Sequence, residues 1–188
     1  MAKDWREMMA WCGELLERST GETVEQWNAK IREADPSSES ELRAWLRERD
    51  IHGYAQMVLI MERFGYPEFL TATADELFDA QYESRPALRP VAERVIELAQ
   101  LAGPEVTIQM RKTYVAFVSP RRTFAQLVPS TRTRIDLGLR LDVPPEGRLL
   151  PAKNLGNRVC PVKIGLTSLD EVDQEVADLL ARSYQENL

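Results

Sequence analysis

The spacing of apolar positions changes once along the chain, and the change divides the sequence into two parts. Up to residue 103 the apolar residues recur at intervals of three and four, as they do on one face of a helix. From residue 106 to residue 166 they alternate with polar residues, as they do in strands with one buried face. This order predicts helices first, then a sheet, and one further helix after residue 168.

Four short apolar stripes in residues 1–68 predict a small bundle of helices. Thr23 and Gln26 have the spacing of a capping box, which favours a helix that begins after Thr23. The sequence Gly65-Tyr66-Pro67 ends the bundle, and the polar residues 69–74 are typical of a linker. We therefore expect a helical domain over residues 1–68, a linker over 69–74 and a second domain over 75–188.

The second domain combines helices with five predicted strands. The clearest strand signal is the alternation from Ile135 to Val143, and short turns between successive strands favour antiparallel pairing. Two helical patterns precede the strands, and Ser168 with Glu171 has the spacing of a capping box for a final helix. The expected fold class is α+β, with a five-stranded, mainly antiparallel sheet that packs one face on helices and leaves the other face polar.

Charge is distributed unevenly between these parts. Residues 104–166 hold 11 Lys and Arg but four Asp and Glu, a net charge of +7, whereas the whole chain is −6 and residues 1–103 are −8. Arg134 and Arg140 are out of phase with the apolar residues of their strand, so the strand pattern places them on the polar face. This asymmetry indicates either an anionic partner or an electrostatic match with the acidic helices of the same chain.

The candidate binding residues are the cations of the polar sheet face and a tyrosine beside them. Arg is well suited to bidentate contact with phosphate or carboxylate groups, so we expect an anionic ligand or an acidic protein partner. A solvated or internally paired face is the competing interpretation, because charged residues are common on the open face of an antiparallel sheet. Nucleic acid is possible but disfavoured by the net negative charge. The predicted site is Arg111, Lys112, Tyr114, Arg132, Arg134 and Arg140.

Residues typical of catalysis and metal binding are few. His52 is the only histidine, so an enzyme would depend on His52 or on carboxylates, and the sequence assigns no catalytic residue. Cys12 and Cys160 are the only cysteines and have no metal-ligand spacing, so no metal and no cofactor are expected. The Gly-containing loop over residues 144–157 is either a connector or a nest of backbone amides for an anion.

Three features favour a cytoplasmic protein. The longest apolar run, Met57 to Met61, is much shorter than the roughly 20 residues that cross a bilayer. Residues 1–5 contain charges where a signal peptide has an apolar stretch, and the two isolated cysteines are typical of free thiols.

Two groups of short motifs are distinctive. The first group is Leu77-Phe78-Asp79-Ala80, Arg85-Pro86-Ala87-Leu88, Lys112-Thr113-Tyr114-Val115, residues 131–139 and residues 166–173, and the second is Thr23-Val24-Glu25-Gln26-Trp27 and His52-Gly53-Tyr54-Ala55. With the first group, residues 75–187 are similar to the bacterial domain-of-unknown-function family 5655. With the second, residues 19–64 resemble family 4287, a short helical domain often fused before it. The resemblance implies a bacterial, cytosolic, two-domain protein whose family has no established activity and transfers no catalytic residue. Some relatives join the 5655 domain to a nuclease-like or nominally transport-related region, and this association slightly favours nucleic acid.

Overall fold

The computed structural model describes residues 5–153, 155 and 159–188. Its chain divides into two compact units, residues 1–72 and residues 73–188, each with its own hydrophobic core. In the part of the chain that the structure describes, no helix has the length and apolar content needed to cross a membrane.

The first unit is helical. Its helices are α1 (Trp5–Thr20), α2 (Val24–Ala34), α3 (Glu39–Arg47), α4 (Gly53–Phe64) and the single turn α5 (Glu68–Thr71). The predicted capping box opens α2, since the Thr23 side chain accepts from the Gln26 amide and the Gln26 side chain accepts from the Thr23 amide. Buried Leu16, Leu46 and Leu59 lie at the centre of the core of this unit.

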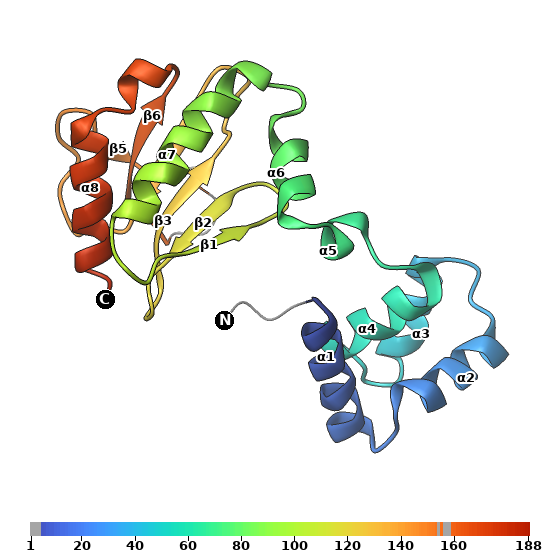
Figure 1. The fold of residues 1–188 in the computed structure, drawn as a ribbon. Helices are drawn as coiled ribbons and strands as arrows, with labels where there is room; N and C mark the ends of the chain where they lie inside the picture. Colours follow the sequence, from blue (N-terminus) through green and yellow to red (C-terminus); the bar gives the residue numbers. More distant parts are fainter. Residues whose placement is uncertain (1–4, 154, 156–158) are drawn as a thin grey trace. The chain divides into compact units, whose positions relative to one another are not determined.

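The second unit is an α+β domain, as the sequence predicted (Figure 1). Its sheet is antiparallel with the order β1-β2-β3-β4-β6-β5, so it has six strands among the described residues instead of the predicted five. The additional strand is the two-residue β5 within the predicted loop, and it pairs with the edge of β6. The elements are α6 (Ala74–Tyr82), the 3-10 turn η1 (Pro86–Leu88), α7 (Arg89–Leu101), β1 (Thr107–Met110), β2 (Val115–Val118), β3 (Thr123–Val128), β4 (Ile135–Leu139), β5 (Leu150–Pro151), β6 (Val162–Leu166), the 3-10 turn η2 (Leu169–Glu171) and α8 (Gln174–Gln185).

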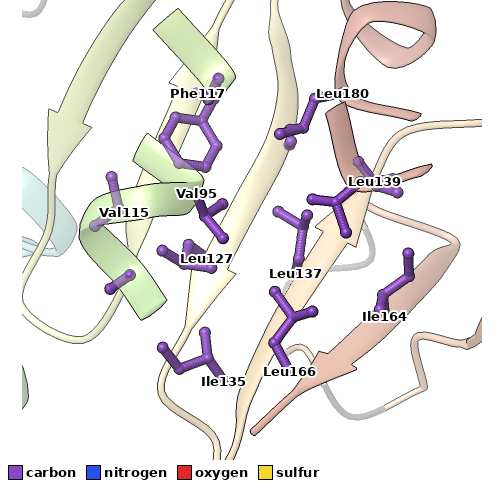
Figure 2. Close-up of a cluster of buried hydrophobic side chains, with 14 of the residues drawn as sticks. Val95, Val115, Phe117, Leu127, Ile135, Leu137, Leu139, Ile164, Leu166 and Leu180 are labelled. Atoms are coloured by element: carbon purple, nitrogen blue, oxygen red, sulfur yellow. The ribbon is translucent and has the colours of Figure 1, made fainter. Parts of the chain in front are cut away.

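One face of the sheet packs on helices. Val95 of α7 and Leu180 of α8 lie against Leu127, Leu137 and other strand residues in a continuous apolar cluster (Figure 2). The alternation from Ile135 to Leu139 supplies this face, and all five residues of β4 are buried. The apolar set that the sequence pattern identified is therefore the set that contacts the helices.

The opposite face of the sheet carries polar residues that are largely buried. Gln126, Asp136 and Lys163 lie on this face and are at most 9% exposed. Part of it is covered by a small apolar cluster of Ala152, Leu155 and Cys160, which packs against Val128 and Val159. The sequence left open whether this face is exposed or covered, and Leu155 and Cys160 cover it at Gly138.

The last helix also begins differently from the prediction. Ser168 precedes the short turn η2, and the Glu171 carboxylate accepts from the backbone and hydroxyl of Thr167. Helix α8 begins at Gln174, and its N-cap is Asp173, whose side chain accepts from the Val176 amide. The Ser168–Glu171 spacing therefore marks a turn before the helix, not the start of the helix itself.

Candidate functional site

Two hairpin turns lie at the same end of the sheet and carry most of the predicted site. The β1–β2 turn closes with a bond from the Arg111 amide to the Tyr114 carbonyl of 2.9 Å, and the β3–β4 turn with one from the Thr131 amide to the Arg134 carbonyl of 3.1 Å. Antiparallel order places both turns at one end, and they share a pocket. The structure thus brings together five of the six predicted residues: Arg111, Lys112 and Tyr114 on the first turn, and Arg132 and Arg134 on the second.

Helix α6 holds the first turn in place. The buried side chain of Gln81 donates to the Arg111 carbonyl at 2.7 Å and to the Tyr114 carbonyl at 3.3 Å. Arg85 donates to the Pro129 carbonyl at the start of the second turn. These contacts fix the backbone of both turns, on which Arg132 and Arg134 are exposed residues.

Arg140 lies apart from the other five residues. It follows β4 at the opposite end, about 20 Å from Arg134 at the usual rise per strand residue. Its Nε donates to the Val159 carbonyl at 3.1 Å. Burial, together with the charges of Arg121 and Arg140, lowers the pKa of Arg122, so these arginines form a separate basic group near the β2–β3 turn.

Asp136 is the centre of a polar cluster that the sequence analysis did not identify. It is 3% exposed, and its Oδ2 accepts from Lys163 Nζ at 2.7 Å and from Ser130 Oγ at 2.7 Å. Arg134 Nε lies 2.9 Å from Oδ1 of the same carboxylate. Asp136 and Lys163 meet because β4 pairs with β6 in a register that sets Gly138 opposite Lys163. The alternation alone could have placed both residues on the polar face, but the pairing of β4 with β6 was needed to bring them into contact.

The carboxyl group of Asp136 is held in its charged form. Burial by itself raises the pKa of a carboxyl, but here the hydrogen bonds from Lys163 and Ser130 and the charges of Lys163 and Arg134 outweigh it. The net result is that the pKa of Asp136 lies below its ordinary value. Asp136 is therefore an ionised group that accepts hydrogen bonds and donates none at neutral pH.

One oxygen of this carboxylate lacks a hydrogen bond. Among the described residues, Oδ1 of Asp136 is buried without a hydrogen bond, although Nε of Arg134 forms an ion pair with it at 2.9 Å. Gly165 makes room for this arrangement, since a Cβ added there would lie 3.0 Å from Cδ of Arg134 and 3.6 Å from Oδ1 of Asp136. Arg134 therefore lies across β6 at a position where the strand has no side chain.

A pocket of about 380 Å³ opens at this cluster. Its volume is near the lower limit of the range for small-molecule sites, which is roughly 300–1,000 Å³. The wall includes one carboxylate and two cations, with hydroxyl groups from both hairpin turns. The lining residues are Thr113, Val128, Pro129, Ser130, Arg134, Asp136 and Lys163.

The acidic helices of this domain pair with their own cations. Arg89 contacts Asp79 at 2.6 Å and Glu93 at 2.9 Å, and Arg94 contacts Glu97 at 2.8 Å. These carboxylates lie on α6 and α7, which contact the other, apolar side of the sheet through their buried residues. The acids of α6 and α7 that form these pairs are therefore engaged within the helical layer.

His52, Cys12 and Cys160 are not among the residues that line this pocket. His52 lies in the other compact unit, where its Nε2 is 3.0 Å from Asp50 Oδ1 on the surface. Burial raises the pKa of the Cys160 thiol to about 12, so this sulfur stays protonated at neutral pH. The described residues contain no group of three or more His, Cys, Asp or Glu side chains placed to hold a metal ion. The predicted nest over residues 144–157 includes residues 154, 156 and 157, which lie outside the described part of the chain.

The fold and the pocket together define an α+β domain with a charged pocket between two basic hairpin turns. Residues 78–187 match the family described as Domain of unknown function (DUF5655), and the chain belongs to that family. This confirms the family resemblance of the C-terminal domain, and the match does not extend into the N-terminal helices. A search of curated proteins and a search of solved structures each gave no match.

Proposed function

We propose that this protein is a non-catalytic binding module and that a small anionic ligand binds in the pocket between its two hairpin turns. The observation that carries the proposal is the placement of Arg134 and Lys163 in the wall of one pocket that holds a single carboxylate. Arg111, Lys112 and Arg132 on the same two turns add positive charge around it. A few charged side chains placed in a concave site fix the orientation of a ligand and provide specificity.

The shape of the site favours a small ligand over an extended one. The cations gather at one end of the sheet around a pocket, while Arg140 belongs to a second group at the other end. A nucleic acid strand is usually held by a groove that follows its backbone, with aromatic residues for stacking. Only Tyr114 of the five residues at the pocket end is aromatic. Nucleic acid is therefore the alternative that the oligonucleotide titration tests, and an acidic protein partner is a second alternative occupant of the basic turns.

We also infer that residues 19–64 form a helical domain related to family 4287 and that the protein acts in the bacterial cytoplasm. The motifs quoted above support the first point. Cys12 and Cys160, both buried as free thiols, support a reducing compartment.

The proposal is tested by titrating the isotope-labelled protein with inorganic phosphate, malonate and a short single-stranded oligonucleotide. We expect phosphate or malonate to shift the amide NMR signals of residues 111–114 and 130–136. Arg134→Gln should weaken binding several-fold, whereas Arg182→Gln, which removes an exposed arginine from α8, should leave it unchanged. Saturable binding of the oligonucleotide alone, with a steep dependence on salt, would instead support the nucleic-acid alternative.

A further inference from the structure

A buried, negatively charged acceptor faces the pocket that we assign to an anion. Asp136 lines the pocket, is 3% exposed and has no hydrogen bond at Oδ1 among the described residues. A buried polar atom without a hydrogen bond costs free energy, so its presence in a well-packed sheet requires an explanation. A ligand that donates a hydrogen bond to this oxygen would explain why the acceptor is kept there.

We propose, on the basis of the function proposed above, that the pocket selects small oxyanions that carry their own hydrogen-bond donor. The anionic oxygens of the ligand contact Arg134 and Lys163, and its O–H or N–H group donates to Oδ1 of Asp136. Hydrogenphosphate and the α-hydroxy carboxylates share this chemistry, because each carries a negative charge and a hydroxyl group a few ångströms apart.

The selectivity follows from the charge of Asp136. An oxyanion without a proton, such as sulfate, presents only acceptors to Oδ1, so the two negative groups repel each other and the buried oxygen stays without a donor. A site built around a buried polar group strongly rejects an analogue that lacks the matching group. Asp136 thus weakens the binding of an oxyanion without a donor and strengthens the binding of one that carries a donor.

Neighbouring residues keep Asp136 in this role. Ser130, Lys163 and Nη2 of Arg134 all donate to Oδ2, so Oδ1 is the oxygen that keeps an unused acceptor position. Gly165 allows Arg134 to lie beside Oδ1, so one guanidinium is close both to the acceptor and to the space that a bound anion would fill. The pocket volume of about 380 Å³ leaves room for a ligand larger than a single phosphate group.

The experiment compares two matched pairs of ligands by calorimetry at mildly alkaline pH. Hydrogenphosphate and sulfate have the same shape and charge and differ in one proton, and lactate and propionate differ in one hydroxyl group. We expect the donor-bearing member to bind about tenfold more tightly or better. A preference within the phosphate–sulfate pair alone assigns the donor to a phosphate hydroxyl, and a preference within the carboxylate pair alone assigns it to an α-hydroxy acid.

The variant Asp136→Asn tests whether the preference for donor-bearing ligands depends on the Asp136 carboxylate. Asp136→Asn keeps the shape but adds an N–H donor and removes the charge, so the preference for hydrogenphosphate over sulfate should fall to about onefold or reverse. Asp142→Asn changes an exposed carboxylate close in sequence and should keep the wild-type preference. If Asp136→Asn does not fold, the two ligand pairs still decide the question with the unmodified protein.

The outcomes separate the two proposals. Equal binding within both ligand pairs overturns the selectivity and leaves the anion site intact. Absence of binding for all four ligands overturns the proposed function itself. A preference that persists unchanged in a folded Asp136→Asn protein overturns the role of Asp136.

Discussion

At the scale of single residues, the Asp136–Lys163 ion pair is the most consequential contact of the site. Both residues are at least nine-tenths buried, and Nζ lies 2.7 Å from Oδ2. Without Lys163, the buried Asp136 keeps only the half-exposed Arg134 as a cationic partner among the described residues, so we expect Lys163→Met to lower the free energy of unfolding by up to about 3–5 kcal/mol. The double variant Asp136→Leu/Lys163→Met should recover most of this loss, as measured by urea denaturation. A Lys163→Met protein as stable as wild type would show that the pair is solvated in solution.

The Asp136 carboxyl also makes the free energy of unfolding depend on pH. Because the folded-state pKa of Asp136 is below its ordinary value of about 3.9, its contribution is present above that pH and is lost as the pH falls through the folded-state pKa. Asp136→Asn removes this contribution, so the stability of the variant should fall less than that of wild type below about pH 4. Urea unfolding over a pH series measures the difference. Comparison with the variant is necessary because Glu171 and Asp173 also have lowered pKa values. Parallel pH curves for the two proteins would contradict the prediction.

At the scale of elements, the sequence predicted what depends on local pattern and missed what depends on pairing. The alternation from Ile135 to Leu139 identified a strand and its buried face, because a half-buried strand has a period of two. It did not reveal that Leu155 and Cys160 cover the second face, since that contact joins segments about twenty residues apart. The two-residue β5 was too short to have a period.

In the candidate site too, the sequence pattern predicted single residues but not the contacts that depend on strand pairing. Arg134 was identified from its position opposite the apolar set of its strand. Asp136 was counted only as a charge, because its partner Lys163 is 27 residues away and becomes a neighbour through the β4–β6 register. Strand order and register are properties of the whole sheet, so the central ion pair required the structure.

Two glycines on adjacent strands provide a matched test of how the sheet positions Arg134. In Gly165→Ala the new Cβ would meet the flexible side chain of Arg134 at 3.0 Å, so we expect a stability change within about 1 kcal/mol but several-fold weaker phosphate binding. In Gly138→Ala the Cβ would lie 2.6 Å from Leu155 Cδ1 and 3.0 Å from Cys160 Cβ. That substitution should destabilise the protein by about 1–3 kcal/mol because the covering segment must move. Thermal unfolding and phosphate calorimetry on both variants distinguish the effects, and unchanged phosphate affinity in Gly165→Ala would show that Arg134 does not need its observed position.

At the scale of the whole molecule, the separate cores predict that residues 73–188 fold without the N-terminal unit. The two clusters share no buried residue, and the second has the size of an independent domain. A fragment that begins at Thr73 retains the capping box of α6, because the Thr73 side chain accepts from the Glu76 amide. We expect cooperative unfolding and NMR signals for this fragment that overlay those of the full chain.

The same fragment decides between a ligand and an internal partner for the basic turns. Residues 1–72 hold nine Lys and Arg against 14 Asp and Glu, so this unit is acidic enough to compete with an anion for the turns. If the pocket is open, as the proposed function requires, phosphate should bind to the fragment and to the full chain with affinities within about twofold at moderate salt. Binding that becomes many-fold tighter on removal of residues 1–72 would show that the acidic unit covers the site in the intact protein. The competition between the acidic unit and the anion would also weaken as salt is added, since exposed charges are screened over about 10 Å at 0.1 M ionic strength. This salt dependence distinguishes the competition from a change in folding.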